Sequence, residues 1–194
     1  MDEEEERAED VETTAGESGL PHDDLAGVVD LFGALTRAEL DRALAELAAR
    51  QGSRAAADVA GALEGYHLVA VDPASGAVEV AEGGVPSGDE GEEFLTVGPV
   101  AFPTLPPGAE DLPHVLDVGP RVVDRASIVG RVEERLRGDA ARAVAAGDVD
   151  RMRHLLDVTY DLETWAADTD VGDVRERLDD ALDAPGGGTG AGEG

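Results

Sequence analysis

The residue types that carry out most enzyme chemistry are scarce in this sequence. Its 194 residues include no cysteine and no lysine, which excludes a thiol nucleophile, a Schiff-base lysine and a P-loop lysine. No serine occupies a G-x-S-x-G motif, and the glycine-rich stretch 186–194 precedes no helix that could hold a phosphate. We therefore expect no catalytic residue and no bound cofactor, and we rank an enzyme with an unrecognised site below two non-enzymatic hypotheses.

Metal-ligand spacing is equally weak. No two of the four histidines are three or four residues apart; they are His22, His67, His114 and His154. The segment 168–173 has the carboxylates of a calcium loop, but its glycine falls at the fifth position instead of the sixth, and Asp179 stands where such loops need glutamate. We expect no metal ligand, and we interpret Asp170 or Asp173 as a helix N-cap.

Arginine is the one functional side chain that clusters. All 15 bases are arginine, and ten of them lie between Arg121 and Arg177. Three fall on one edge of a long helix predicted to end at Ala146, beside its apolar arc: Arg131, Arg135 and Arg142. One interpretation is that their stems cover the margin of the core while their heads pair with Glu134 and Asp139. The other is a contact face for an acidic partner or a nucleic acid, and these three are our candidate partner-contact residues.

The net charge indicates where the protein works. With 44 acids and 15 bases the formal net charge is −29, and it is spread along the whole chain. Such an excess of acid suits a solvated acidic surface in a salt-loaded cytoplasm, as in halophiles. The alternative is that the acidic surface acts as a decoy or binds a basic partner. The acidic N-terminus does not resemble a signal peptide, and no apolar run approaches the roughly 18 residues of a membrane helix. We expect a cytoplasmic protein with no membrane partner.

The elements that would position these residues are clearest between Leu35 and Val71. Thr36 followed by Glu39 forms a capping box, and Leu40, Ala43, Leu44 and Leu47 recur at helical spacing. Gly52 suits the end of this helix, and Ser53 would cap a second helix that ends at Gly65. The β-branched stretch 66–71 predicts a strand, and after a turn 77–81 predicts a returning strand.

With a first helix after Pro21, the order is helix, helix, helix, hairpin, which is that of a winged-helix domain. In such a domain the Ser53–Gly65 helix would enter the DNA major groove, with Arg54 as the candidate DNA contact. However, residues 20–72 hold nine acids against four arginines, and 77–97 hold no base at all. Because phosphate contacts dominate DNA affinity, the charge disfavours DNA as a partner.

We predict a mostly helical α+β fold in which a winged-helix-like N-terminal domain is followed by a C-terminal helical domain. The predicted segments are a disordered acidic tail (1–19), the winged-helix-like domain (20–97), a proline-rich strap over the domain junction (98–120), a helical domain beginning at Arg121 (121–183) and a disordered glycine tail (184–194).

Three stretches resemble an uncharacterised family of halophilic archaea: VVDLFGALTRAELDRALAELA, VGPVAFPTLPPGAEDLPHVLDV and RAVAAGDVDRMRHLLDVTYDLETW. The resemblance covers roughly 25–182 and implies a haloarchaeal setting, with no activity to carry over. Our first hypothesis is a non-enzymatic interaction or regulatory module that binds an unidentified protein partner. The alternative is a DNA-binding transcriptional regulator of winged-helix type. The sequence does not fix the oligomeric state.

Overall fold

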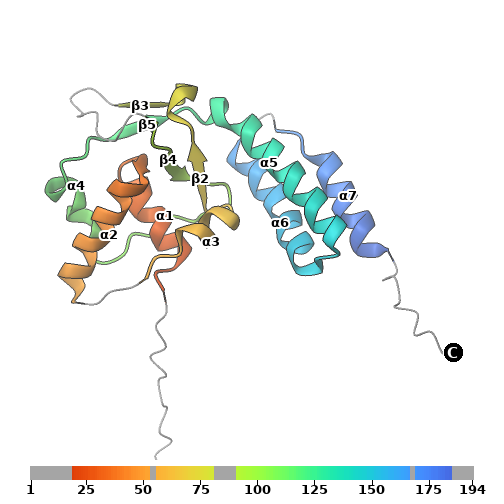
Figure 1. Cartoon of the computed structure of the whole chain (residues 1–194), viewed down its shortest axis with the longest axis horizontal. Coiled ribbons are helices and arrows are strands. Elements are labelled where there is room, and N and C mark those ends of the chain that lie inside the picture. Colours follow the sequence, from red (N-terminus) through yellow and green to blue (C-terminus); the bar gives the residue numbers. More distant parts are fainter. Residues whose placement is uncertain (1–18, 53–55, 81–90, 167–168, 185–194) are drawn as a thin grey trace, which may run out of the picture.

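The structure is a computed structural model that describes residues 19–52, 56–80, 91–166 and 169–184 (Figure 1). Helices dominate, and the strands form a three-stranded and a two-stranded antiparallel sheet, which confirms a mostly helical α+β fold. The predicted acidic tail and glycine tail lie outside the described residues, except for Gly19 and Ala184.

The first half contains three helices and a sheet of three short strands. Its elements are α1 (His22–Asp30), β1 (Ala34–Thr36), α2 (Arg37–Gln51), α3 (Val59–Glu64), β2 (Leu68–Val71) and β4 (Phe94–Val97). The sheet order is β1-β4-β2, with Leu95 opposite both Leu35 and Ala70. β4 is therefore the central strand, although it comes last along the chain.

The predicted start and end of α2 are confirmed. The Glu39 N–H donates to Thr36 Oγ1 at 3.2 Å, and the Thr36 N–H donates to Glu39 Oε2 at 2.8 Å. Gly52 ends the helix in the left-handed region at φ 66°, where glycine carries no steric cost. Leu40, Ala43 and Leu47 are buried, so the apolar stripe faces the core as the spacing predicts.

The third helix was predicted to begin at Ser53, and this is wrong, because α3 begins at Val59. The Asp58 side chain accepts from the Gly61 N–H at 2.8 Å and caps the helix there. Two residues before this cap, the Ala56 carbonyl accepts from the Leu20 N–H at 3.1 Å. This hydrogen bond belongs to the β-bridge between Leu20 and Ala57, so this segment is not helical. Ser53 and Arg54 lie outside the described residues.

The predicted hairpin and the helix start at Arg121 also need correction. β2 pairs with β4, whereas the returning strand β3 (Val78–Val80), which follows the turn η1 (Pro73–Ser75), pairs with β5 (Arg121–Val123). Asp124 accepts from the Ala126 N–H at 3.1 Å and starts the helix only after β5. The two β-branched valines before that cap suit a strand, and the sequence analysis missed both this strand and β1.

The proline-rich strap contacts both halves. It holds a 3₁₀ turn, η2 (Ala109–Asp111), and the short helix α4 (Leu112–Val115). Ala109 and Leu112 are buried in the core of the first half, while Val100 packs against the second core. The Thr104 N–H donates to the Asp23 carbonyl at 3.0 Å, so the strap is fixed along α1.

The second half consists of three helices that lie side by side in Figure 1: α5 (Arg125–Ala146), α6 (Val149–Trp165) and α7 (Gly172–Asp183). Their number and their end at Asp183 are as predicted. The two halves share the sheet, because Leu68 of β2 is buried in the first core and Val69 and Val71 in the second. The alternation of side chains along one strand thus joins the two cores.

Candidate functional site

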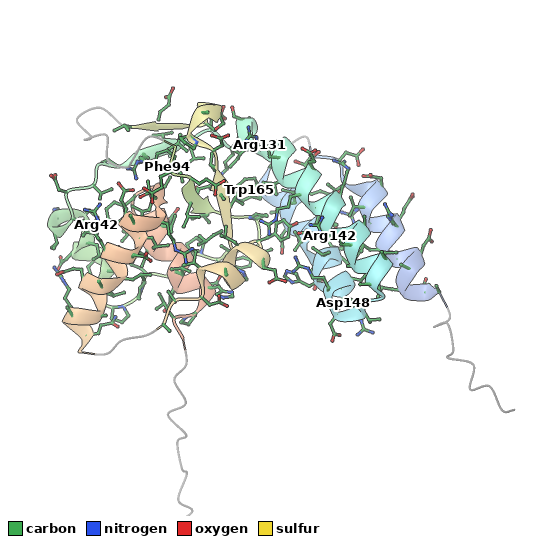
Figure 2. The ribbon with its side chains drawn as sticks, in the orientation of Figure 1. Arg42, Phe94, Arg131, Arg142, Asp148 and Trp165 are labelled. Carbon is green, nitrogen blue, oxygen red and sulfur yellow. The ribbon has the colours of Figure 1, made fainter. Side chains whose placement is uncertain are left out.

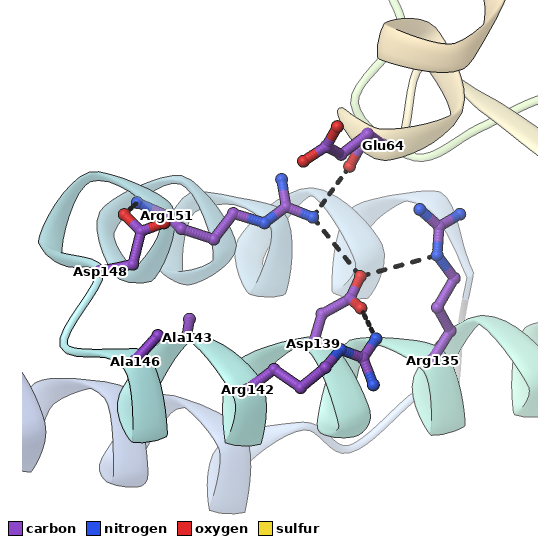
Figure 3. Close-up of a pocket in the computed structure, with 8 residues that line it drawn as sticks. All are labelled: Glu64, Arg135, Asp139, Arg142, Ala143, Ala146, Asp148 and Arg151. Atoms are coloured by element: carbon purple, nitrogen blue, oxygen red, sulfur yellow. Dashed lines mark hydrogen bonds and ion pairs between the residues drawn. The ribbon is translucent and has the colours of Figure 1, made fainter.

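A cluster of charged side chains surrounds Asp139 on α5, whose side chain is only 12% exposed (Figure 3). The Tyr66 hydroxyl donates to Asp139 Oδ2 at 2.7 Å. Arg135 Nε lies 3.6 Å and Arg151 Nη2 lies 3.4 Å from the same oxygen, and Arg142 pairs with Oδ1. One carboxylate therefore meets three guanidinium groups.

Helix geometry explains how these arginines meet. Arg135 and Arg142 stand four residues before and three residues after Asp139, which places all three on one face of α5. Arg151 comes from the first turn of α6, which begins at an N-cap, Asp148, whose carboxylate accepts from the Arg151 N–H at 3.0 Å. The turn between α5 and α6 thus brings the third arginine to the cluster.

The cluster also holds the end of α3. Arg135 Nη2 donates to the Leu63 carbonyl at 2.7 Å, and Arg151 Nη2 donates to the Glu64 carbonyl at 3.0 Å. The last carbonyls of a helix have no partner within it, and cations near them are favourable. Arg135 and Arg151 therefore attach α3 of the first half to α5 and α6 of the second.

Tyr66 stands at the centre of this junction in an unusual backbone conformation. Its φ is 62°, and it is the only described residue other than glycine with a positive φ. A left-handed conformation costs a non-glycine residue about 1–2 kcal/mol. The guanidinium of Arg135 lies 4.2 Å from the centroid of its fully buried ring. Burial and the hydrogen bond to Asp139 raise the pKa of the Tyr66 hydroxyl, which therefore stays protonated and remains a donor.

A cavity of about 410 Å³ opens beside the cluster. Its lining residues, drawn in Figure 3, are Glu64, Arg135, Asp139, Arg142, Ala143, Ala146, Asp148 and Arg151. The two alanines lie on the last turns of α5, where their small side chains leave the space open.

The structure divides the predicted arginine edge. Arg135 and Arg142 meet at Asp139, and the pairing predicted for that carboxylate is observed. Arg131 is 61% exposed and lies 3.8 Å from Asp72. Figure 2 shows Arg131 and Arg142 well apart along α5, as eleven residues of helix, roughly 16 Å, require. No ion pair among the described residues involves Glu134, and the candidate DNA contact Arg54 lies outside those residues.

Sequence reasoning missed Arg151 and Tyr66 as members of this cluster. Each comes from a different element than Asp139, and no spacing in the sequence indicates that α3, α5 and α6 meet. The weak signal was Gly147-Asp148, a stop followed by a cap, which predicts that α6 folds back along α5.

The fold gathers histidines that are remote in the sequence. The rings of His22 and His67 lie 5.0 Å apart, edge to face, and His154 on α6 is close enough to influence His67. Burial is the main cause that lowers the pKa of both His67 and His154. The described residues contain no group of three or more histidines and carboxylates able to hold a metal. The N-cap predicted at Asp170 or Asp173 is wrong, because the N-cap of α7 is Val171, which makes no side-chain hydrogen bond; Asp170 stands one residue earlier and accepts from the Gly172 N–H at 3.1 Å.

This architecture is that of a two-core, mostly helical α+β protein with a charged junction between its cores. The chain belongs to a family of unknown function, DUF7109, whose model matches residues 23–183. The predicted resemblance to an uncharacterised family is confirmed over nearly the same range. No curated protein and no solved structure matches the chain. Among the described residues, no helix has both the length and the apolar character needed to cross a membrane.

Proposed function

We propose that this protein is a non-enzymatic interaction or regulatory module that binds a protein partner in the cytoplasm of a halophilic archaeon. Its first half would be winged-helix-like and its second half a helical platform. The order α1, α2, α3 and an antiparallel β2–β4 pair, with β1 as third strand, supports the winged-helix part. The net charge of −29 supports the halophilic setting.

The observation that carries the protein-binding proposal is the exposure of Phe102 on the strap. The chain has three phenylalanines, and the side chain of this one is 75% exposed, with Leu105 at 42% three residues later. Burying a phenylalanine contributes about 1.5–3 kcal/mol, which the isolated fold does not gain here. Exposed aromatic anchors of this kind are typical of protein interfaces.

The backbone around Phe102 is fixed before any partner binds. The Phe102 N–H donates to Asp23 Oδ1, and the Thr104 N–H donates to the Asp23 carbonyl, both at 3.0 Å. A prepositioned anchor loses little conformational entropy on association, which favours affinity.

The test is to isolate the partner from the native host at high potassium chloride, purify it and measure its Kd. We expect Phe102→Ala to weaken binding at least tenfold. Val149→Ala is the matched control, because Val149 is also exposed, at 42%, but lies on α6. Equal Kd values for the wild type and Phe102→Ala would contradict this interface.

The second candidate is a DNA-binding transcriptional regulator, which the same helix and strand order favours. Specific DNA affinity needs positioned phosphate contacts, and the strands β3 and β4 carry no base. If DNA binds at all, we expect it to use Arg135 rather than Arg54. A salt titration with genomic DNA decides between them: loss of affinity in Arg54→Ala alone would restore the conventional winged-helix mode.

A further inference from the structure

We propose that the cavity beside Asp139 binds a small molecule carrying a phosphate group, held by Arg142 and Arg151 with support from Arg135. This site goes beyond the partner surface on the strap, and neither depends on the other.

The first argument is local charge. The three guanidinium groups converge on a single carboxylate in Figure 3, so the Asp139 cluster holds an excess of two positive charges inside a protein of net charge −29. Glu64 and Asp148 also line the cavity and formally balance this excess. However, Asp148 caps α6, where the positive end of the helix dipole offsets its charge, and the exposed Glu64 side chain is held in the cavity by no ion pair to an arginine among the described residues, so water can screen it. Two cations gathered this way match a phosphate monoester, which carries about −1.5 to −2 charges at neutral pH.

The second argument is donor capacity. A guanidinium has five N–H donors in a planar fork that suits phosphate oxygens. The hydrogen bonds and ion pairs of Arg142 and Arg151 side chains within the described residues all run through Nη2. Nε and Nη1 of both arginines can therefore donate to a ligand without breaking the contacts to Asp139 and α3.

The third argument is space and preorganisation. A volume of about 410 Å³ exceeds what a chloride or a phosphate ion needs and suits a small organic phosphate. Asp139 and the Arg151 side chain are only 12% and 20% exposed, so salt screens this charge less than it screens an open surface. The strained Tyr66 backbone beneath the cluster is the kind of feature that concentrates at binding sites.

The experiment titrates the full chain in molar potassium chloride with phenyl phosphate, inorganic phosphate and benzoate, following heat release and melting temperature. We expect saturable binding of the two phosphate probes, with a higher melting temperature, and at least tenfold weaker binding of benzoate. The Arg142 side chain is 73% exposed, so its loss should leave the fold intact. Arg142→Gln should weaken the binding of phenyl phosphate at least tenfold. Arg151→Gln should do the same but also loosens α3.

Two further variants separate the cavity from general charge. Ala146→Leu keeps every arginine and fills the cavity from an exposed position, so it should abolish binding of phenyl phosphate. Arg153 of α6 is 67% exposed, close to the 73% of Arg142, and pairs with Asp150 outside the cavity. The Arg153→Gln variant should therefore bind phenyl phosphate as the wild type does. The proposal is overturned if the folded wild type shows no saturable phosphate binding, if benzoate binds equally well, or if Ala146→Leu binds unchanged.

Discussion

Among single residues, Glu39 has two structural roles at once. It closes the capping box of α2, and its carboxylate also forms a buried ion pair with Arg121 of β5. Arg121 Nη1 and Nη2 donate to Glu39 Oε2 and Oε1 at 2.7 Å each, and Nη1 donates to the Ala34 carbonyl at 2.8 Å. Both side chains are 1% exposed, so water does not reach either charge and each is stabilised by the other.

Removing one partner of this pair should strongly destabilise the protein. Glu39→Gln keeps a side-chain oxygen for the cap but leaves a buried arginine without its counter-charge, and we expect a loss of about 3–5 kcal/mol in the free energy of unfolding. Denaturant unfolding at high potassium chloride measures this. The control is Arg50→Gln, which breaks two more exposed ion pairs, with Glu46 and with Asp111 of the strap, and should lower the melting temperature far less. Similar losses in both variants would disprove the special role of the buried pair.

The capping box was predictable because it lies within four consecutive residues and has its own local signature. The ion pair was not, because its partners are 82 positions apart and Arg121 was assigned to a helix. The Asp139 cluster shows the same limit: its i−4 and i+3 arginines follow from helix spacing, whereas Tyr66 and Arg151 need the packing of other elements. Local chemistry is readable in the sequence; contacts between elements depend on tertiary packing.

Among the elements, α1 and α5 provide matched glycines for a test of packing. A Cβ on Gly27 of α1 would overlap the Thr104 carbonyl of the strap, whereas a Cβ on Gly130 of α5 would meet open space. We expect Gly27→Ala to lower the melting temperature by displacing the strap. Gly130→Ala should raise stability by about 0.5–1 kcal/mol, the usual gain from alanine in a helix. Thermal unfolding of both variants checks this, and a stabilised Gly27→Ala would contradict the close approach.

Two partly buried histidines, His67 just before β2 and His154 on α6, predict a dependence of stability on pH. The pKa of His67 and of His154 is lowered in the folded protein, mainly by burial, so folding favours the neutral rings. Their contribution is complete above the unfolded pKa of about 6.5 and is lost as pH falls toward the folded pKa values. His22 and Arg151 act in the same direction, while Asp23, Asp157 and Asp161 oppose it. We expect the melting temperature to fall between about pH 7 and pH 5.

Replacing the buried rings should flatten this profile. His67→Gln combined with His154→Gln should remove most of the decrease, while His114→Gln on the exposed side of α4 should retain it. An unchanged slope in the double variant would assign the decrease to carboxylates instead. The pKa of Asp161 is raised chiefly by burial, so protonation of this carboxyl at lower pH stabilises the folded protein and opposes the decrease in melting temperature.

Sequence patterns located the long helices well and the strands poorly. α2, α5, α6 and α7 have apolar periodicity over several turns, together with caps or glycines at their ends. The stretch 77–81 located β3, but β1 and β5 are three residues each and too short for a period-two pattern to appear. Their pairing depends on where β4 and the strap lie, which is a property of the tertiary fold.

For the molecule as a whole, charge should govern stability. At net charge −29 self-repulsion opposes the compact state, and at 1 M salt the Debye length shrinks to about 3 Å. We predict that folding needs salt of molar order, measured by circular dichroism and melting temperature against potassium chloride. A full helical signal and an unchanged melting temperature in dilute buffer would refute the need for salt.

The last turn of α7 holds acids and no base, so Asp180→Asn should raise the melting temperature more in low salt than in high salt.

The central position of β4 has a consequence for biosynthesis. The ribosome delivers β1 and β2 well before the strand that pairs with both, and Arg121 emerges 82 residues after Glu39. At about 5–20 residues per second, Glu39 waits roughly 4–16 s for its counter-charge. During that interval the nascent chain carries two unpaired strand edges, which are sites of unwanted association. The helices α5 to α7 emerge after Arg121, pack largely on neighbours in sequence and can close soon after they are made, so only the first half has to wait for partners that are distant in the chain.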